Sequence, residues 1–131
     1  MQLNEPPNEL FAAHPEIFGG ALPIRGGWGY SFEDAVIVAG DNWFRGVSVE
    51  YEFVDRRNHA ELVFCKSDSE VMVELNKKLL MQNLSSFERG HYDVLKFELS
   101  VLPKQALDML RLMREYFFDI TGFYGKFRPL L

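Results

Sequence analysis

Two stretches of the chain alternate strictly between apolar and polar residues. Successive side chains of a β-strand point to opposite faces of a sheet, so this alternation predicts strands with one buried face. We therefore predict strands at residues 47–53 and 94–101. The apolar positions are Val47, Val49, Tyr51 and Phe53 in the first, and Leu95, Phe97, Leu99 and Val101 in the second. In the first strand, Glu50 and Glu52 would share the polar face.

Further strands are predicted around the first one. Residues 35–39 form a short apolar run that ends at Gly40-Asp41-Asn42, which is typical of a strand buried on both faces and closed by a turn. Residues 55–59 have the composition of a hairpin connection, and residues 62–65 would be the returning strand. We expect a turn at 88–91 before the strand at 94–101.

Two other stretches favour helices. Ser67 and Glu70 have the spacing of a capping box, which marks the start of a helix. The residues that follow, 68–84, carry apolar side chains at helical spacing. The same residues also alternate, so a strand remains open there, and we favour the helix on intrinsic propensity. Residues 103–122 begin with a proline, carry an apolar stripe from Ala106 to Ile120 at helical spacing, and end at Gly122.

These elements fit one domain spanning residues 1–131. Residues 1–24 hold four of the six prolines, so we expect an extended lead-in with at most a helical turn at 8–13. Residues 123–131 form an aromatic tail that needs covering. Because strands are grouped ahead of helices, we predict an α+β fold with an antiparallel sheet and about two helices.

One stretch is unusually mixed: Gly26-Gly27-Trp28-Gly29-Tyr30-Ser31-Phe32-Glu33-Asp34-Ala35-Val36-Ile37. It contains three glycines, three aromatic residues and a pair of carboxylates. Glycine is selected where the backbone needs positive φ or close approach to another surface. A turn, a bulge or a binding site would each account for the stretch.

The negative charge of the chain is concentrated in its first half. Residues 1–60 hold nine acidic and four basic residues, whereas residues 61–131 hold ten of each, which together give the net charge of -5. An acidic surface repels phosphate backbones and attracts basic proteins. The charge therefore disfavours nucleic-acid binding and is compatible with a cationic partner, although solubility alone also explains it.

The single cysteine and the first residues of the chain limit the classes of protein to which it can belong. Cys65 is the only cysteine, which excludes an intramolecular disulfide and a cysteine-based zinc cluster. The first residues lack the basic and apolar regions of a signal peptide, and no apolar run approaches the length of a membrane span. We expect a cytoplasmic protein that does not enter a membrane.

Motifs for catalysis are weak. The three histidines, His14, His59 and His91, form no short-spaced ligand pair. No nucleophile motif or phosphate loop accompanies the glycines. Glu33 and Asp34 are neighbours, and neighbours on a strand point to opposite faces, so the two carboxylates would rarely share a site. We expect no metal, no cofactor and no catalytic residue.

Three segments together resemble a bacterial family. They are Gly26–Tyr30 with Glu33–Ile37, Gly46–Val54 before Arg56-Arg57, and Tyr92–Glu98 ahead of Pro103. They are similar to immunity proteins of contact-dependent growth inhibition, the CdiI group of Neisseria and Escherichia, over roughly residues 20 to 105.

The resemblance implies a small cytoplasmic protein that neutralises a toxin delivered by neighbouring cells. It implies a fold likened to the Whirly single-stranded-DNA-binding domain, although the acidic charge argues against nucleic-acid binding here. The implied partner is the C-terminal nuclease domain of the toxin, an EndoU-like RNase in at least one related system. Such an inhibitor would occlude the active site and needs no chemistry of its own.

The predicted contact residues follow from charge and expected exposure, because carboxylates steer association and aromatic residues supply buried area. They are Glu33, Asp34, Glu50, Glu52 and Asp55, with Trp28 and Tyr30 as aromatic anchors. Two alternatives remain open: a small hydrolase using Glu33 or Asp34 with a histidine, and an oligomeric adaptor resting on the aromatic tail and the methionine-rich segment. Monomer and homodimer are equally compatible with the sequence.

Overall fold

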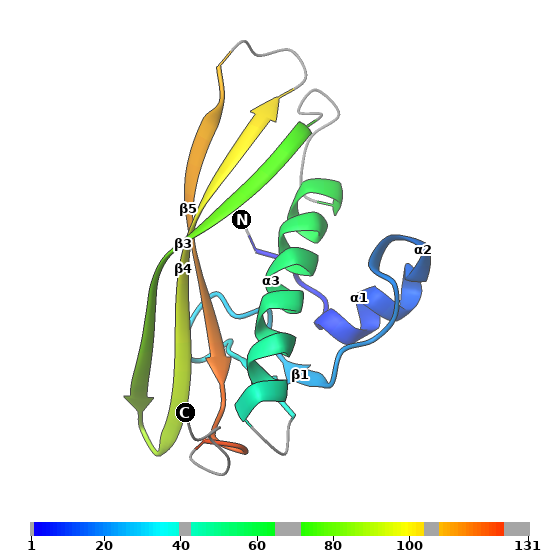
Figure 1. Ribbon diagram of the computed structural model, residues 1–131. Helices are drawn as coiled ribbons and strands as arrows, with labels where there is room; N and C mark the ends of the chain where they lie inside the picture. The colour runs from blue at the N-terminus through cyan, green and yellow to red at the C-terminus, as the bar shows by residue number, and fades with distance from the viewer. Residues whose placement is uncertain (1, 40–42, 65–71, 104–107, 125–131) are drawn as a thin grey trace.

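The computed structural model describes residues 2–39, 43–64, 72–103 and 108–124 (Figure 1). Its helices are α1 (Pro7–Ala13), α2 (Pro15–Phe18) and α3 (Trp43–Phe64). Its strands are β1 (Ile24–Gly26), β2 (Val36–Val38), β3 (Met72–Phe87), β4 (Gly90–Pro103) and β5 (Leu110–Asp119). The α+β class predicted from the sequence is confirmed.

The strands form one mixed sheet in the order β1-β2-β5-β4-β3. Three pairings are antiparallel, as predicted, but β2 and β5 are parallel. The parallel pair is short, since it joins only Val36 to Phe118 and Ile37 to Asp119. Strands β3, β4 and β5 are much longer and dominate the sheet.

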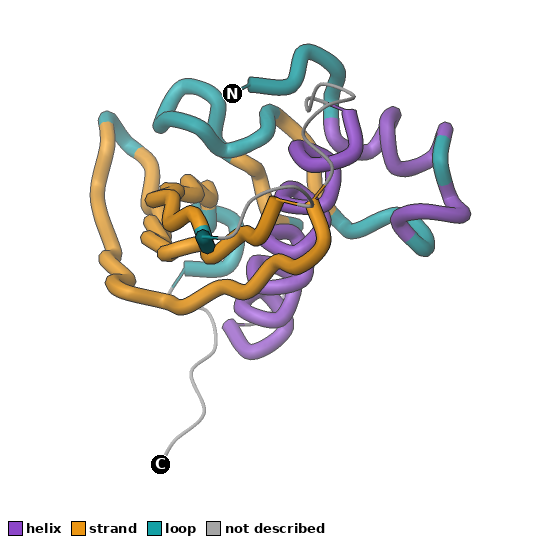
Figure 2. Tube along the Cα trace, turned by 90° about the horizontal axis from the view of Figure 1, so that it is seen from above, coloured by secondary structure: helices purple, strands orange, loops and turns teal. Residues whose placement is uncertain are grey.

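One face of the sheet carries the helices. Figure 1 shows α3 between the long strands and the α1–α2 pair, and Figure 2 shows the helices gathered to one side of the curved strands. Helix α3 runs opposite to β5: Phe53 meets Phe118, Arg57 lies over Tyr116, and Glu61 reaches Arg114. The order of these contacts fixes the direction of the helix on the sheet.

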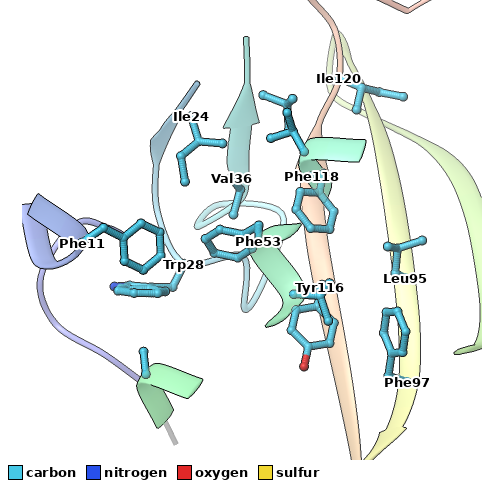
Figure 3. Packing of buried hydrophobic residues seen from close by; sticks show 14 of the residues in the cluster. Phe11, Ile24, Trp28, Val36, Phe53, Leu95, Phe97, Tyr116, Phe118 and Ile120 are labelled. Atoms are coloured by element: carbon cyan, nitrogen blue, oxygen red, sulfur yellow. The ribbon is translucent and has the colours of Figure 1, made fainter. Parts of the chain in front are cut away.

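The core lies between this face and the helices and is rich in aromatic rings (Figure 3). Phe53 of α3 is fully buried and contacts Trp28 at 5.9 Å and Phe118 at 5.7 Å between ring centroids. Phe11 of α1 packs edge-on against Trp28 at 5.6 Å. The lead-in is therefore part of the core, with two short helices where the sequence predicted mostly extended chain.

Several local predictions are confirmed. The buried strand predicted at 35–39 is β2, the strand predicted at 94–101 lies within β4, and the helical turn at 8–13 is α1. The predicted turn occurs at Glu88 and Arg89, where Glu88 has a φ of 54°.

The strand predicted at 47–53 is wrong, together with the hairpin at 55–59 and the returning strand from 62: residues 43–64 form one helix. Its buried positions recur at helical spacing, but four of them are polar: Glu50, Arg57, Asn58 and Glu61. These polar residues hid the helical period, and the β-branched residues between 47 and 54 imitated a strand.

The helices predicted at 68–84 and 103–122 are also wrong. Residues 72–87 form β3, the alternative that the sequence left open, and residues 110–119 form β5. The apolar residues of both stretches fit the helical period of 3.6 and the strand period of two. Both stretches form strands because they pair with β4 along its length. The predicted turn at 40–42, the capping box at 67–70, Cys65, residues 104–107 and the tail from 125 onward lie outside the described residues.

Gly46 joins the helix to the C-terminal end of the described chain. A Cβ added at this position would overlap the ring of Phe123, which is fully buried. The ring of Phe123 therefore packs directly on the backbone of α3, and it leaves no room for a side chain at position 46.

Gly46→Ala should lower the free energy of unfolding by about 1–3 kcal/mol, because the new methyl overpacks a filled core. At an open helix position the same change would stabilise by roughly 0.5–1 kcal/mol, so the sign is diagnostic. Urea denaturation measures it, with the exposed Ser48→Ala on the same helix as control. Equal or higher stability of Gly46→Ala would contradict the packing of Phe123 on α3.

Candidate functional site

The seven predicted contact residues do not form one surface. Glu33, Glu52 and Asp55 are exposed, Asp34 and Tyr30 are half-buried, and Trp28 and Glu50 are buried. The prediction that Glu50 and Glu52 share a solvent-facing strand is wrong, because both lie on α3 two residues apart and so point in different directions. Glu50 faces the core and Glu52 faces solvent.

Trp28 acts as an anchor inside the fold. Only 2% of its surface is exposed, its ring lies between Phe11 and Phe53, and its Nε1 donates to the carbonyl of Glu5. The indole thus ties the lead-in to the core and is unavailable to a partner in this conformation (Figure 3).

The glycine-rich stretch is a loop that runs beside β5. Gly29 has a φ of 81°, and a Cβ there would come within 3.0 Å of the Phe117 carbonyl. Its N–H donates to the carbonyl of Asp34 at 2.7 Å, and its own carbonyl accepts from the N–H of Phe117 at 2.9 Å. The Asp34 carboxylate accepts from the N–H of Tyr30 at 3.3 Å. The glycines and Asp34 therefore shape the loop.

Arg57 connects this loop to α3 and β5. Its guanidinium is buried between the rings of Tyr30 and Tyr116, whose centroids lie 4.0 and 4.1 Å away. Its Nη1 donates to the carbonyls of Trp28, Gly29 and Glu115 at 3.3, 3.1 and 3.0 Å. One side chain thus joins three separate segments of the chain.

The charge of Arg57 is balanced by Glu61, one helical turn later. The Nε of Arg57 donates to one Glu61 oxygen at 2.9 Å, and Arg114 of β5 donates to the other at 3.3 Å. Beside them the Tyr116 hydroxyl donates to the Asn58 side chain, and burial raises the pKa of Tyr116. We call Tyr30, Arg57, Glu61, Arg114 and Tyr116 the Arg57 cluster. Its sequence signal was the (i, i+4) spacing of Arg57 and Glu61, which the predicted hairpin concealed.

A second buried polar group connects α3 to β4. Glu50 is 1% exposed, and its carboxyl group lies inside the fold. Asp93, fully buried on β4, lies beside it and accepts from the Gln82 amide at 2.9 and 3.2 Å. Burial, and then the neighbouring Asp93, raise the pKa of Glu50 from 4.5 to about 11. Glu50 is therefore protonated at neutral pH.

Asp34 and the three histidines of the alternative hydrolase hypothesis have other contacts in the fold. The side chain of Asp34 is used by its own loop, and the ring contacts of His14, His59 and His91 are with Phe64, Phe18 and Tyr124. No group of three or more His, Cys, Asp or Glu residues in the described ranges is arranged to hold a metal ion. None of the helices in these ranges is long and apolar enough to cross a membrane.

Two hollows lie along the sheet. One of about 690 Å³ lies at the end of β1 and β2, lined by Arg25, Ala39, Asp119 and their neighbours. Another of about 360 Å³ lies against β5 and is lined by Tyr30, Arg57, Lys96, Met113, Arg114, Glu115 and Phe117. The second therefore opens from the Arg57 cluster to solvent.

Comparison with protein-family models, with curated proteins and with solved structures finds no significant match to this chain.

Arg57→Met should lower the free energy of unfolding by about 3 kcal/mol or more, because Glu61 loses its closest ion-pair partner and three carbonyls lose a buried donor. Arg89→Met is the control, since Arg89 lies exposed in the turn between β3 and β4; it should cost about 0.5 kcal/mol or less. Chemical denaturation compares the two. Similar costs for both variants would remove the Arg57 cluster as a support of the fold.

The raised pKa of Glu50 predicts a pH effect. The folded chain keeps this proton and the unfolded chain releases it, so stability falls as pH rises from about 4.5 to 11. Glu50→Gln removes the group, and its stability relative to wild type should increase with pH by up to about 1.4 kcal/mol per pH unit. Thermal unfolding across pH, with Glu52→Gln as the exposed control, tests this. Parallel profiles for Glu50→Gln and wild type would refute the burial of Glu50 as an acid.

Proposed function

We propose that this protein is a cytoplasmic immunity protein that binds and neutralises the nuclease domain of a contact-dependent growth inhibition toxin. It acts by occluding the toxin and not by catalysis. Two observations support the proposal: the way the three family-like segments meet in the fold, and the distribution of exposed acidic residues.

The three segments of the resemblance are joined by the two buried polar groups. Arg57, in the second segment, binds Trp28, Gly29 and Tyr30 of the first. Glu50, also in the second, lies beside Asp93 of the third. The three segments, far apart in the sequence, therefore meet around shared buried groups in the fold, and this supports treating them as one set.

The observation that carries the binding role is the acidic outer layer formed by the lead-in. Residues 2–24 contain Glu5, Glu9 and Glu16, all exposed, and no lysine or arginine. Helix α3 adds the exposed Glu52 next to this layer, because the neighbouring Arg56 donates to the carbonyl of Gly20. We call Glu5, Glu9, Glu16 and Glu52 the acidic layer.

A basic nuclease cleft provides the complementary charge. Such a cleft is built to receive phosphates, and a carboxylate surface can take their place and accelerate association. An EndoU-like RNase is the toxin class implied by the resemblance. Of the contact residues predicted from sequence, Glu33, Glu52 and Asp55 are exposed, the last two in ion pairs with Arg56 and Lys77. Trp28 and Glu50 leave the proposed contact set because they are buried.

The proposed function predicts that the gene directly upstream encodes a large secreted protein that ends in a nuclease domain, and the test uses that domain. Co-expression should protect cells from that domain, and the purified chain should bind it and block its RNase activity. A triple variant, Glu9→Lys/Glu16→Lys/Glu52→Lys, should lower the association rate about tenfold or more at low salt, because steering depends on these charges. Raised salt should slow the wild type in the same way.

The matched control reverses three acidic residues of the second half, Glu88→Lys/Glu98→Lys/Asp108→Lys, and so changes net charge equally. It should bind more rapidly than the acidic-layer variant. Equal rates for the two variants would mean that net charge, and not this layer, governs association. Failure to bind or protect against the upstream domain would overturn the proposed function itself.

A further inference from the structure

Strand β5 has an open edge over most of its length. On one side it pairs with β4 from Leu110 to Asp119. On the other side β2 reaches only Phe118 and Asp119, and the glycine-rich loop reaches Phe117. Within the described residues, no strand pairs with the second side of residues 110–116. These seven residues form a regular strand, since their register with β4 has no bulge.

The backbone groups at this edge have a definite pattern. The N–H of Phe117 points away from β4, because it donates to Gly29. Backbone direction alternates along a strand, so the groups of Glu115, Met113 and Arg111 point the same way. The Glu115 carbonyl accepts from Arg57, and the Met113 carbonyl accepts from the side chain of Arg114. A carbonyl has two lone pairs, so each retains capacity for a strand partner.

The side chains at the edge are self-complementary. Arg111, Met113 and Glu115 lie on the sheet face away from the helices. Along the edge they place a cation, an apolar side chain and a carboxylate in that order. In an antiparallel pairing of two copies centred on Met113, each Arg111 lies directly opposite the partner's Glu115, and the two methionines face each other. Opposite charges directly across a strand pair are stabilising, and like charges are not.

The register is fixed by the ends of the open segment. It starts where β5 starts, at Leu110, and stops at Tyr116, because the N–H of Phe117 is already bonded. The midpoint of 110–116 is Met113, so a second copy in this register fills the whole open edge. The hollow of about 360 Å³ beside Met113, Glu115 and Phe117 provides room at the edge.

Exposed apolar side chains accompany the edge. Met109, Leu110 and Met113 are 44–48% exposed, which is high for large apolar residues. A hydrophobic edge strand with free backbone groups is a preferred site for pairing with another chain. Burial of these side chains would add to the backbone hydrogen bonds.

The opposite edge of the sheet is less suitable. Strand β3 also exposes apolar residues, but its register with β4 shifts between Leu79 and Met81, and Lys77 and Lys78 precede the shift. Bulges and lysines are features by which edge strands resist pairing. Strand β5 has neither within 110–116.

We propose that the protein forms a two-fold symmetric homodimer in which residues 110–116 of β5 pair antiparallel with the same residues of a second copy, centred on Met113. The two sheets then join into one. In the combined sheet each Glu115 lies between Lys96 of its own β4 and the second copy's Arg111. The proposal concerns the isolated protein and does not depend on a toxin.

The full chain should sediment with twice its mass of 15.2 kDa across a dilution series. Arg111→Glu should raise the dissociation constant about tenfold or more, because the symmetric interface loses two charge pairs and gains repulsion. Glu115→Arg should do the same. The double variant Arg111→Glu/Glu115→Arg restores opposite charges and should recover most of the affinity. Circular dichroism confirms that each variant is folded.

A cross-link tests the register. Directly opposite residues of a hydrogen-bonded antiparallel pair have Cα atoms about 5.5 Å apart, within the range of a disulfide. In a Cys65→Ser background, Met113→Cys should oxidise to a covalent dimer, whereas Met81→Cys on β3 should not. A monomeric wild type, no rescue by the double variant, or cross-linking through Met81→Cys instead of Met113→Cys would each overturn the proposal.

Discussion

The fold depends on one buried cation. Arg57 is held between two tyrosine rings, is neutralised by Glu61, and donates to backbone carbonyls from the glycine-rich loop and from β5. A buried guanidinium is costly unless its donors and charge are satisfied, so the surrounding segments must adopt the positions that satisfy it. This requirement fixes where the loop lies on β5 and how α3 lies on the sheet, and the aromatic core fills the space that results.

This arrangement separates the buried residues that hold the fold together from the exposed residues that the proposed partner would contact. The glycine-rich loop, Arg57 and the Glu50–Asp93 pair are interior, and their role is to hold loop, helix and sheet together. The carboxylates of the acidic layer are exposed and lie on the lead-in and on α3. Under the proposed function, such an outer layer can differ between toxins without disturbing the buried network. The open edge of β5 is a further surface, separate from that layer.

The sequence predicted the α+β class, β2, β4 and the turn between β3 and β4, because in each case a local pattern and tertiary pairing agree. It failed for α3, since polar residues at buried positions broke the hydrophobic period that reveals a helix. It also failed for β3 and β5, where either period fits and only pairing with β4 decides. The Arg57 cluster could not be predicted, because its members come from the glycine-rich loop, α3 and β5, and the sequence did not predict the last two.

We propose that the buried network supports the fold while the acidic layer contacts the toxin. Amide hydrogen exchange of the chain, alone and bound to the upstream toxin domain, tests this most directly. Added protection should concentrate in α1, in α2 and in the half of α3 that contains Glu52. Protection confined to the sheet face away from the helices, with α1 and α2 unchanged, would contradict it.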